Sequence, residues 1–444
     1  MKISNFFDEN FSSYANYDSF RSIGSFLDGF KPTARKLIAT ADTQKINEPM
    51  KLSSFVNKMS DLFEYLHGPV AAEGVAVGLA QNFTGTNNIN LMKPAGSFGT
   101  RTIPKSAASR YIKTCKEPIF DKLFNPLDKP ILIEQFFEGT KIEPRFYIPI
   151  IPMILVNGNE GIGNGFAQKI LPRDPKALIS FIIKRISDKK TDNNILPYYR
   201  GFKGKINRIE NSSYEIFGCF ERVNSTTIHI TELPIGYDSE KYNNILARLE
   251  DDKVIIDYND NSVENNFLFE IKVTREFNKK DDEWIFNKLK LIRRVTENFT
   301  CIGENNEIVE FNNEIEIINK FIEVRLDYYN KRKDYLINKI KKELMILGGK
   351  YYFIKCILDD IIQINKKTKN DIIKQLELQS CFPFSKLESY DFLLNMPIHS
   401  LTKETFNDIK EQIDKKKLEL KEITEKTIES MWTEELKELD KYLK

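Results

Sequence analysis

The sequence predicts a multidomain α+β protein, and three successive changes in its texture carry that prediction. About the first 165 residues are rich in glycine, small residues and turn signals. Short alternating stretches typical of strands follow from about Asp174 to Cys301, and helical periodicity continues from Asn313 to the end. A chain of 444 residues with 41% hydrophobic content is long enough for two to four domains with their own cores.

The glycine-rich region contains DGFKPTARK, HGPVAAEG, AGSFGTR and NGNEGIGNG. Such a density of glycine indicates a backbone that approaches other groups closely. The run GNEGIGNG follows the apolar segment FYIPIIPMILV, as a phosphate loop follows a strand. It lacks both the GxGxxG spacing and the Lys-Ser/Thr pair, so we expect no nucleotide loop in this chain.

The middle region predicts a separate α+β domain. STTIHITEL, KVIIDY and NFLFEIKV alternate apolar and polar residues and are expected to be strands. DPKALISFIIKRI begins with Asp-Pro, a helix start signal, and is expected to be a helix.

Two long amphipathic helices are predicted in the last third. One begins at Asn313, is interrupted at Gly348-Gly349, and carries a stripe of Tyr329, Leu336, Ile340, Leu344 and Leu347. The other begins near Ser400, where Lys403-Glu404 gives a loose capping signal, and carries Phe406, Ile409, Ile413, Leu420 and Ile423. An ordinary helical domain is the alternative. The length of both helices favours an antiparallel coiled coil with a globular insert at about 350–398.

Composition excludes several classes of protein. No run of 18 apolar residues is present, so no membrane span is expected, and the start MKISNFFDENFSS lacks an apolar signal core. The five cysteines lie far apart without a CxxC pair, which is typical of a reducing compartment. The three histidines are equally scattered, so we expect no metal site in this chain. The net charge of +2 is uninformative, because the basic residues gather locally.

The most basic segment runs from Leu91 to Lys116 and holds six basic residues, no acidic one, and the dipeptide Arg110-Tyr111. A phenol is a weak nucleophile at neutral pH. A guanidinium beside it can stabilise a charged oxygen and neutralise an attacked phosphate. The segment therefore suits a site that breaks a nucleic-acid strand and holds its end. The alternative is a partly buried tyrosine at a helix start on a basic surface.

Several motifs, in order, resemble the DNA breakage-reunion portion of type IIA DNA topoisomerases. They are RSIGSFLDGFKPTARK, GLAQNFTGTNNINLMKPAGSFGTR, AASRYI, YIPIIPMILVNGNEGIGNGF, FIEVRLDYYNKRKDYL and SLTKETF. The chain shows neither ATPase motifs nor the acidic set of a toprim metal site. An independent chain of this extent is most similar to the medium subunit of T-even-type bacteriophage enzymes, and a fragment of a fused enzyme is the alternative. Met1 favours a complete subunit.

The resemblance implies a domain plan. It comprises a winged-helix cleavage domain at 1–170, a tower domain at 171–305, coiled-coil arms at 306–348 and 400–444, and a globular helical exit gate at 349–399. Two chains are expected to associate through the exit gate.

The resemblance also implies roles for single residues. Tyr111 matches the nucleophile that forms a 5′-phosphotyrosyl bond, and Arg110 matches the arginine that stabilises the attacked phosphate. Ile162 matches a wedge that kinks DNA, and the glycines around it would let its loop enter the minor groove. The alternative is a core isoleucine, which the glycines on both sides disfavour. The expected contacts to DNA phosphates are Arg21, Lys31, Arg35 and His67.

The expected partners are double-stranded DNA and a large subunit that binds both ATP and Mg²⁺. The expected activity is ATP-dependent relaxation and decatenation, in the cytoplasm of a phage-infected host. The alternative is a non-catalytic DNA-bending or structural protein on the same scaffold. Two departures from the family, Gly24 for proline and Ala34 for glutamine, leave the local loop geometry open.

Overall fold

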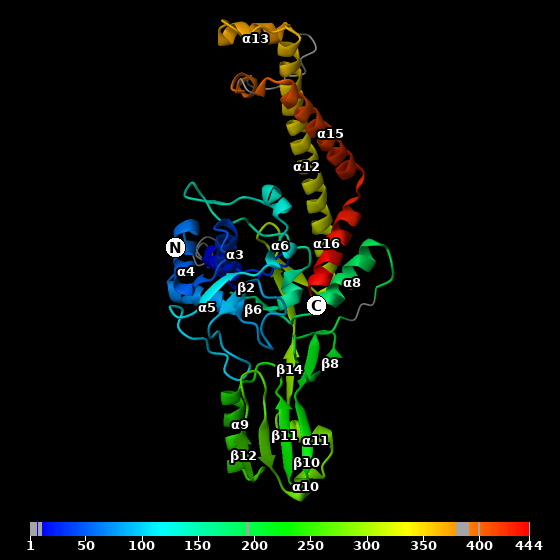
Figure 1. Cartoon of the computed structure of the whole chain (residues 1–444). Coiled ribbons are helices and arrows are strands. Elements are labelled where there is room, and N and C mark those ends of the chain that lie inside the picture. Colours follow the sequence, from blue (N-terminus) through cyan, green and yellow to red (C-terminus); the bar gives the residue numbers. More distant parts are fainter. Residues whose placement is uncertain (1–6, 8–10, 192–194, 379–389, 398–399, 444) are drawn as a thin grey trace. The chain divides into compact units, whose positions relative to one another are not determined.

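The structure is a computed structural model that describes residues 7, 11–191, 195–378, 390–397 and 400–443. It divides into two compact units. The first comprises Met1–Arg325 with Thr433–Lys444, and the second comprises Leu326–Trp432 (Figure 1). The finer boundaries at 170, 305 and 348 remain predictions.

The first unit begins with helices and a small sheet that form a winged helix. The helices are α2 (Ser12–Ser22), α3 (Pro32–Thr43), α4 (Leu52–Phe63) and α5 (Pro69–Ala80). Both α3 and α5 have proline at their first turn, where its missing N–H leaves no hydrogen bond unmade. The antiparallel sheet has the order β1-β3-β2, with β1 at Met50–Lys51, β2 at Met92–Ala95 and β3 at Lys113–Lys116. The strand β3, which begins two residues after Tyr111, is the central strand of this sheet.

Short elements connect the winged helix to a second sheet. They are α6 (Phe120–Leu123), the 3-10 helix η2 (Pro126–Ile131), β4 (Phe136–Phe137), β5 (Thr140–Lys141) and α7 (Met153–Asn157). The second sheet has the order β16-β15-β7-β6. Its strands are β6 (Asn159–Ile162), β7 (Ala167–Ile170), β15 (Asn298–Ile302) and β16 (Ile308–Phe311). The predicted boundaries at 170 and 305 therefore both fall within one sheet.

Gln168 of β7 holds this sheet to the turn after α2. Its buried amide accepts a hydrogen bond from the Gly24 N–H (2.8 Å) and donates to the carbonyls of Gly24 and Thr300. A β-carbon at Gly24 would lie 2.2 Å from Asn159 Nδ2. Proline at position 24 would remove this N–H donor, so Gln168 and Asn159 account for the departure from the family pattern.

A helix and two antiparallel sheets make up the middle region. Helix α8 (Pro175–Ile186) starts as predicted, with the Asp174 side chain accepting the Lys176 N–H. One sheet, β14-β9-β8, contains β8 (Lys205–Glu210), β9 (Ser213–Phe217) and β14 (Ile292–Thr296). The other, β10-β11-β13-β12, contains β10 (Cys219–Asn224), β11 (Thr227–Glu232), β12 (Asp257–Asp260) and β13 (Phe269–Lys272).

We call β8 to β14, with α9 (Ser239–Asp251), α10 (Arg275–Asn278) and α11 (Asp282–Lys288), the tower. Its core contains Ile228, Ile230, Leu246, Phe269 and Ile271. The predicted strands in STTIHITEL and NFLFEIKV are confirmed as β11 and β13. The strand predicted in KVIIDY begins only at Asp257, because Val254 and Ile255 form the turn after α9 and pack against this core.

Helix α12 (Glu314–Leu358) runs for 45 residues without a break, so the predicted interruption at Gly348-Gly349 is wrong. A glycine inside a helix costs about 1 kcal/mol relative to alanine. Helix-forming residues on both sides and the packing of α12 against α15 (Lys403–Glu425) outweigh that cost. The glycines therefore lie within the helix.

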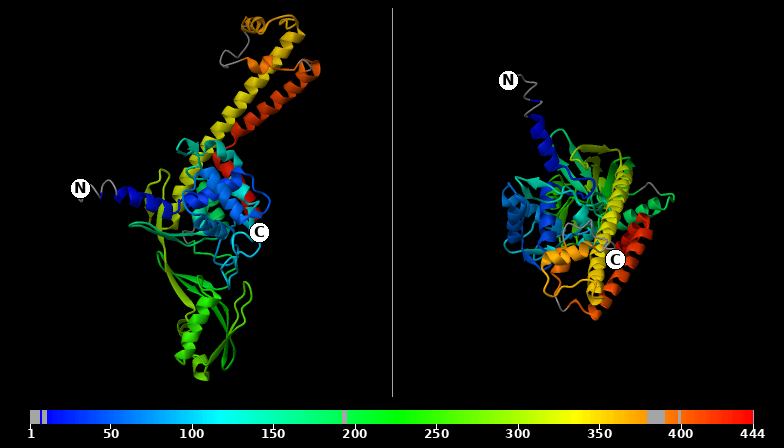
Figure 2. Two further views of the ribbon diagram at one scale, coloured as in Figure 1. Left: turned by 90° about the vertical axis from the view of Figure 1, so that its left-hand side faces the viewer. Right: turned by 90° about the horizontal axis from the view of Figure 1, so that it is seen from above.

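Three contacts in the second unit show that α12 and α15 are antiparallel. Lys333 Nζ donates to the Thr424 carbonyl (2.9 Å), and Glu343 pairs with Lys416 (2.8 Å). The Tyr351 and Phe406 rings stack with centroids 4.4 Å apart. The partner numbers fall as the α12 numbers rise, and Figure 2 shows the two helices side by side. The predicted coiled coil is confirmed.

The ends of these helices differ from the prediction. The N-cap of α15 is Thr402 and not Ser400, since its side chain accepts the Thr405 N–H. A separate helix, α16 (Ile428–Tyr442), follows the break at Lys426. The insert contains α13 (Lys369–Glu377) and α14 (Asp391–Leu394), with a core of Phe353, Cys356, Ile362, Leu376 and Leu393. Residues 379–389 and 398–399 of the expected exit gate lie outside the described residues.

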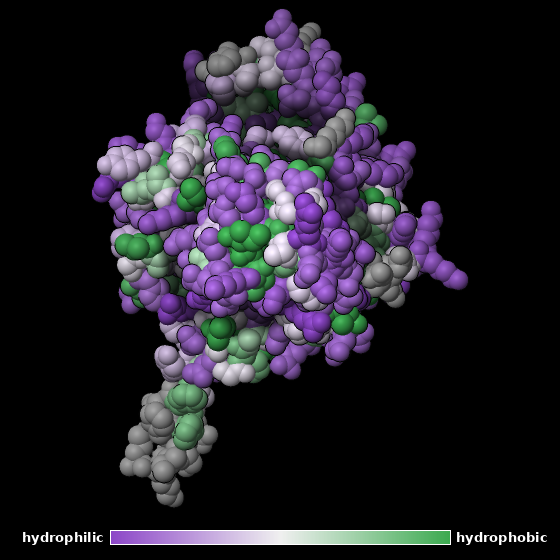
Figure 3. Space-filling view, turned by 90° about the horizontal axis from the view of Figure 1, so that it is seen from below, coloured by the Kyte–Doolittle hydropathy of each residue, from purple (hydrophilic) through white to green (hydrophobic). Residues whose placement is uncertain are grey.

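Among the described residues, no helix is long and apolar enough to cross a membrane. The face in Figure 3 is mostly hydrophilic, with its hydrophobic residues in separate small groups. Such scattered apolar residues are ordinary on a protein surface.

Candidate active site

The candidate nucleophile, Tyr111, lies on an exposed turn between α5 and β3. Its side chain is 71% exposed, and its N–H donates to the Ala108 carbonyl (2.9 Å). The guanidinium carbon of Arg110 lies 4.9 Å from the centre of the Tyr111 ring. The alternative of a partly buried tyrosine at a helix start is wrong, because the turn leads into a strand and leaves the ring accessible.

The basic segment around this turn separates into exposed and internal cations. Lys93, Lys105, Arg110 and Lys113 are exposed, and no carboxylate within the described part of the chain pairs with any of them. Lys116 instead pairs with Asp121 (2.8 Å), and Arg101 is only 4% exposed. Exposed cations that lack internal partners are the kind that bind phosphates.

Helix α5 holds the turn through one side-chain hydrogen bond. The Ser109 hydroxyl donates to Glu73 Oε1 at 2.7 Å, directly before Arg110. Sequence reasoning did not single out Glu73. Only the fold brings it beside a residue 36 positions later in the chain.

Two of the predicted DNA contacts, Arg21 and His67, lie on either side of Tyr17. The Arg21 guanidinium lies 5.4 Å from the centre of the Tyr17 ring, and the Tyr17 hydroxyl lies 3.4 Å from His67 Nε2. All three side chains are exposed. Tyr17 was missed in the sequence, where only its position one helical turn before Arg21 could have indicated it.

Ile162 lies at the end of β6, in the β6–β7 hairpin, and is 80% exposed. The interpretation as a core isoleucine is therefore wrong. The neighbouring glycines were expected to let the hairpin enter a DNA groove. In the structure they also allow a close approach to α2, because a β-carbon at Gly161 would lie 1.9 Å from the Ser22 carbonyl oxygen and one at Gly163 would lie 3.0 Å from Ser19 Cα. The glycines allow the hairpin to pack against α2.

Lys31 supports the same hairpin. Its Nζ donates to the Glu160 carbonyl at 2.7 Å, two residues before Ile162. Burial lowers the pKa of Lys31, and the nearby Glu160 carboxylate opposes this effect. The hairpin, Lys31 and the end of α2 thus form one connected group of contacts.

Arg35 does not fit the prediction of a DNA contact. Its side chain is 4% exposed and pairs with fully buried Asp28, through Nε to Oδ2 (2.9 Å) and Nη2 to Oδ1 (3.0 Å). Nη2 also donates to the Phe30 carbonyl. Burial disfavours the charge of Arg35, but Asp28 compensates and the pKa of Arg35 is raised. We therefore replace the expected phosphate contact by a structural role in the loop before α3.

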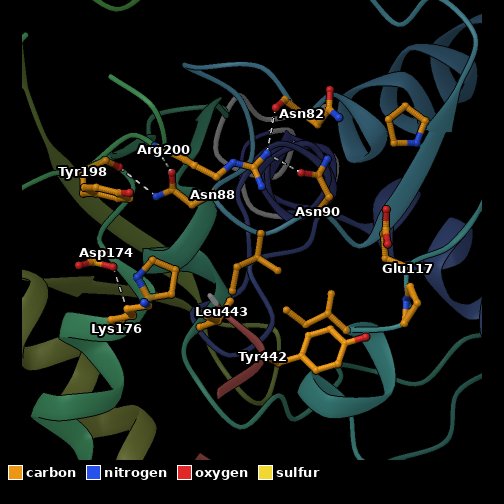
Figure 4. A pocket seen from close by; sticks show the side chains of 15 residues that line it. Asn82, Asn88, Asn90, Glu117, Asp174, Lys176, Tyr198, Arg200, Tyr442 and Leu443 are labelled. Atoms are coloured by element: carbon orange, nitrogen blue, oxygen red, sulfur yellow. Dashed lines mark hydrogen bonds between the residues drawn. The ribbon is translucent and has the colours of Figure 1, made fainter. Parts of the chain in front are cut away.

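A cavity of about 640 Å³ lies elsewhere in the first unit and contains none of the predicted site residues. Figure 4 shows the Arg200 side chain directed toward Asn82 and Asn90, and it donates to the Asn82 carbonyl and to Asn90 Oδ1. The Asn88 amide donates to three backbone carbonyls. These polar groups are largely engaged within the protein, so the cavity is a weaker candidate for chemistry than the exposed turn.

The described residues contain no group of three or more His, Cys, Asp or Glu side chains that could hold a metal ion.

The comparisons with known proteins agree with the motifs. Residues 21–437 match the family that comprises the A subunits of DNA gyrase and topoisomerase IV. The chain belongs to this family. It is similar to the crystal structure of the Plasmodium falciparum topoisomerase II DNA-binding, cleavage and re-ligation domain, with a TM-score of 0.89 and 32% identity over 99% of this chain and 64% of the other.

Among curated proteins, the chain is 33% identical to the mitochondrial DNA topoisomerase 2 of Dictyostelium discoideum, over 99% of this chain and 35% of the relative. It is 32% identical to DNA topoisomerase 2 of Plasmodium falciparum, over 96% of this chain and 33% of the relative. The chain thus spans about a third of the length of these relatives. Both come from eukaryotes, so the closer resemblance to a phage subunit remains a prediction.

Proposed function

We propose that this chain is the DNA-cleaving and rejoining part of a type IIA topoisomerase. The observation that carries the proposal is the exposed Arg110-Tyr111 turn among cations without internal partners, in a chain of this family. The fold of a topoisomerase II cleavage and re-ligation domain supports it.

The proposed reaction is a transesterification. The Tyr111 hydroxyl oxygen attacks a DNA phosphorus in line, and a bond from phosphorus to tyrosine oxygen forms as the bond to the 3′ oxygen breaks. The phenol proton is lost and the leaving 3′ oxygen gains one. The number of phosphoester bonds is unchanged, so attack by the 3′-hydroxyl can reseal the strand without ATP. Arg110 stabilises the negative charge that grows on the attacked phosphate.

Binding and bending of DNA are assigned to other groups of the first unit. Lys31, Arg21 and His67 are proposed phosphate contacts, and Ile162 is the proposed wedge between base steps. Two chains that associate through the exit gate would supply two tyrosines for the two strands.

ATP and Mg²⁺ are assigned to a partner that supplies the ATPase and toprim functions. The resemblance supports a separately encoded large subunit, as in T-even-type phages, with both polypeptides acting in the cytoplasm of the host. The complete enzyme would then relax and decatenate DNA at the expense of ATP.

Reconstitution tests this proposal. The chain is mixed with large subunits encoded by the same genome, Mg²⁺, ATP and supercoiled plasmid, and covalent complexes are trapped with denaturant. DNA should be linked to this chain, and Tyr111→Phe should abolish the link while leaving DNA binding intact. A link that survives in Tyr111→Phe contradicts the proposed nucleophile. A wild-type chain that bends DNA but never becomes linked would instead support the non-catalytic alternative.

A further inference from the structure

The loop before the candidate nucleophile is attached to the tower by Arg101 and Thr102. The Arg101 guanidinium donates from Nη1 to the Tyr237 carbonyl (2.5 Å) and from Nη2 to the Leu233 carbonyl (2.9 Å). It also lies 3.4 Å from Glu232 Oε1 and packs on the Phe267 ring, 4.8 Å from the ring centre. One side chain thus contacts the end of β11, the loop after it, and the segment just before β13.

The backbone of the same two residues adds further bonds to the tower. The Arg101 N–H donates to Asn265 Oδ1 (2.9 Å), and both the N–H and the hydroxyl of Thr102 donate to the Glu264 carbonyl (3.1 and 2.7 Å). The Ser239 N–H donates to the Thr102 carbonyl (3.1 Å). We call this set of contacts the tower clasp.

Burial disfavours the charged forms of both members of the ion pair in the clasp. Burial lowers the pKa of Arg101 although Glu232 opposes the shift, and burial raises the pKa of Glu232 although Arg101 opposes it. Arg101 Nε is buried without a hydrogen-bond partner. A buried ion pair of this kind adds little to stability compared with apolar residues of similar volume.

The other end of the same loop is held by α5. Ser109 donates to Glu73 on α5. Gln81, the residue after α5, donates from Nε2 to the carbonyls of Phe98 and Pro104 (both 2.9 Å), which lie on either side of the clasp. The loop from Arg101 to Ser109 is therefore attached to the tower at Arg101 and Thr102, and to the winged helix at Pro104 and Ser109. Arg110 and Tyr111 follow directly.

We propose that Arg101 is a positioning residue for DNA cleavage, because the tower clasp makes the position of Tyr111 depend on the position of the tower. This inference rests on the proposed function of Tyr111. A displacement of the tower is transmitted through the loop to the turn that carries the nucleophile. In-line attack is sensitive to such displacements, since misplacing a reacting group by about 1 Å can slow a reaction by about 10²-fold.

Arg101→Met tests the clasp, and Arg222→Met is the matched control. Arg222 also belongs to the tower, pairs with a carboxylate (Asp282, 2.6 Å) and donates to two carbonyls, of Asn278 and Lys280, but it does not contact the loop. In the reconstituted enzyme at saturating DNA, Arg101→Met should slow single-turnover formation of the covalent complex by about 10- to 100-fold. Its DNA dissociation constant should stay within about threefold of wild type, and Arg222→Met should change neither quantity.

Asn265→Ala is a milder variant that removes one exposed hydrogen-bond acceptor of the clasp. Because only one hydrogen bond is lost, it should slow cleavage by a few-fold. Hydrogen exchange of the isolated chain gives a readout that needs no activity. The amides of residues 103–112 should exchange faster in Arg101→Met than in wild type or Arg222→Met, while β10 to β13 stay protected.

Unchanged exchange in residues 103–112, or equal loss of cleavage in Arg101→Met and Arg222→Met, would overturn the inference. A wild-type enzyme that forms no covalent complex would instead refute the proposed function, and the exchange result would still decide whether the clasp orders the loop.

Discussion

Replacing Arg35 by methionine separates a structural role from a DNA contact. Asp28, the partner of Arg35, is fully buried and also accepts the N–H groups of Phe30 and Tyr147 (both 2.9 Å). Methionine fills much of the space of the arginine side chain but leaves this carboxylate without its cation. Removal of one partner from a buried ion pair costs about 3–5 kcal/mol. We expect Arg35→Met to lower the free energy of unfolding by this amount.

Two measurements on the same variant test this expectation. Urea unfolding reports the free energy, and DNA binding over a range of salt concentrations reports the number of phosphate contacts. If Arg35 is structural, the free energy of unfolding should fall strongly in Arg35→Met. The salt dependence of DNA binding, measured where the variant is still folded, should not change. Adding Asp28→Asn to Arg35→Met should recover part of the stability, because the buried charge is then removed while an acceptor remains for one of the two N–H groups.

Lys113→Met is the matched control, because Lys113 is exposed and has no carboxylate partner among the described residues. It should show the opposite pattern, with stability within about 0.5 kcal/mol of wild type and a salt slope smaller by about 1. An Arg35→Met chain that keeps its stability but loses about one unit of salt slope would refute the structural role and restore the DNA contact.

Three further predictions concern the hairpin and the helices around it. Ile162→Ala should leave stability within about 0.5 kcal/mol, because the side chain is 80% exposed, but reduce DNA bending measured by energy transfer between end labels; a stability loss without a bending change would contradict the wedge. Burial lowers the pKa of Lys31, so Lys31 should lose its charge at a lower pH than an ordinary lysine, whose pKa is about 10.4. DNA affinity should therefore fall at lower pH in wild type than in Lys31→Arg, and identical pH profiles would refute this. Gly161→Ala should cost about 1–3 kcal/mol, because its β-carbon would meet the Ser22 carbonyl oxygen, whereas Gly78→Ala, with open space inside α5, should add about 0.5–1 kcal/mol. Thermal unfolding of both variants checks the pair, and effects of equal sign would contradict it.

Features that depend on local sequence were predicted well. The start of α8 at Asp174-Pro175 follows from capping chemistry, which acts within a few residues. The two apolar stripes indicated two amphipathic helices, and their length on both sides of a globular insert favoured the antiparallel coiled coil that the structure shows. The exposure of Ile162 could be predicted because it lies between glycines in a short turn-rich segment.

Features that depend on distant partners were not predicted. The residues next to Arg35 and Arg101 in the sequence do not distinguish them from surface cations. In the structure both side chains are buried, Arg35 against Asp28 and Arg101 against carbonyls of the tower. The Gly348-Gly349 pair is a local signal for a helix end, but α12 continues through both residues because its packing stabilises the helix. Glycine and arginine are ambiguous in a sequence, since their roles are decided by what lies next to them in space.

The sequence by itself determined the family, the order of the elements and the identity of the candidate nucleophile, because each is encoded in motifs or periodicities of neighbouring residues. Only the tertiary structure decided which cations of the basic segment face solvent. It also decided how the loop bearing Tyr111 is held, through Glu73 on α5 and through Arg101 on the tower. The physical reason is that burial and hydrogen bonding join residues more than 30 positions apart in the sequence, from Glu73 to Ser109 and from Arg101 to Tyr237.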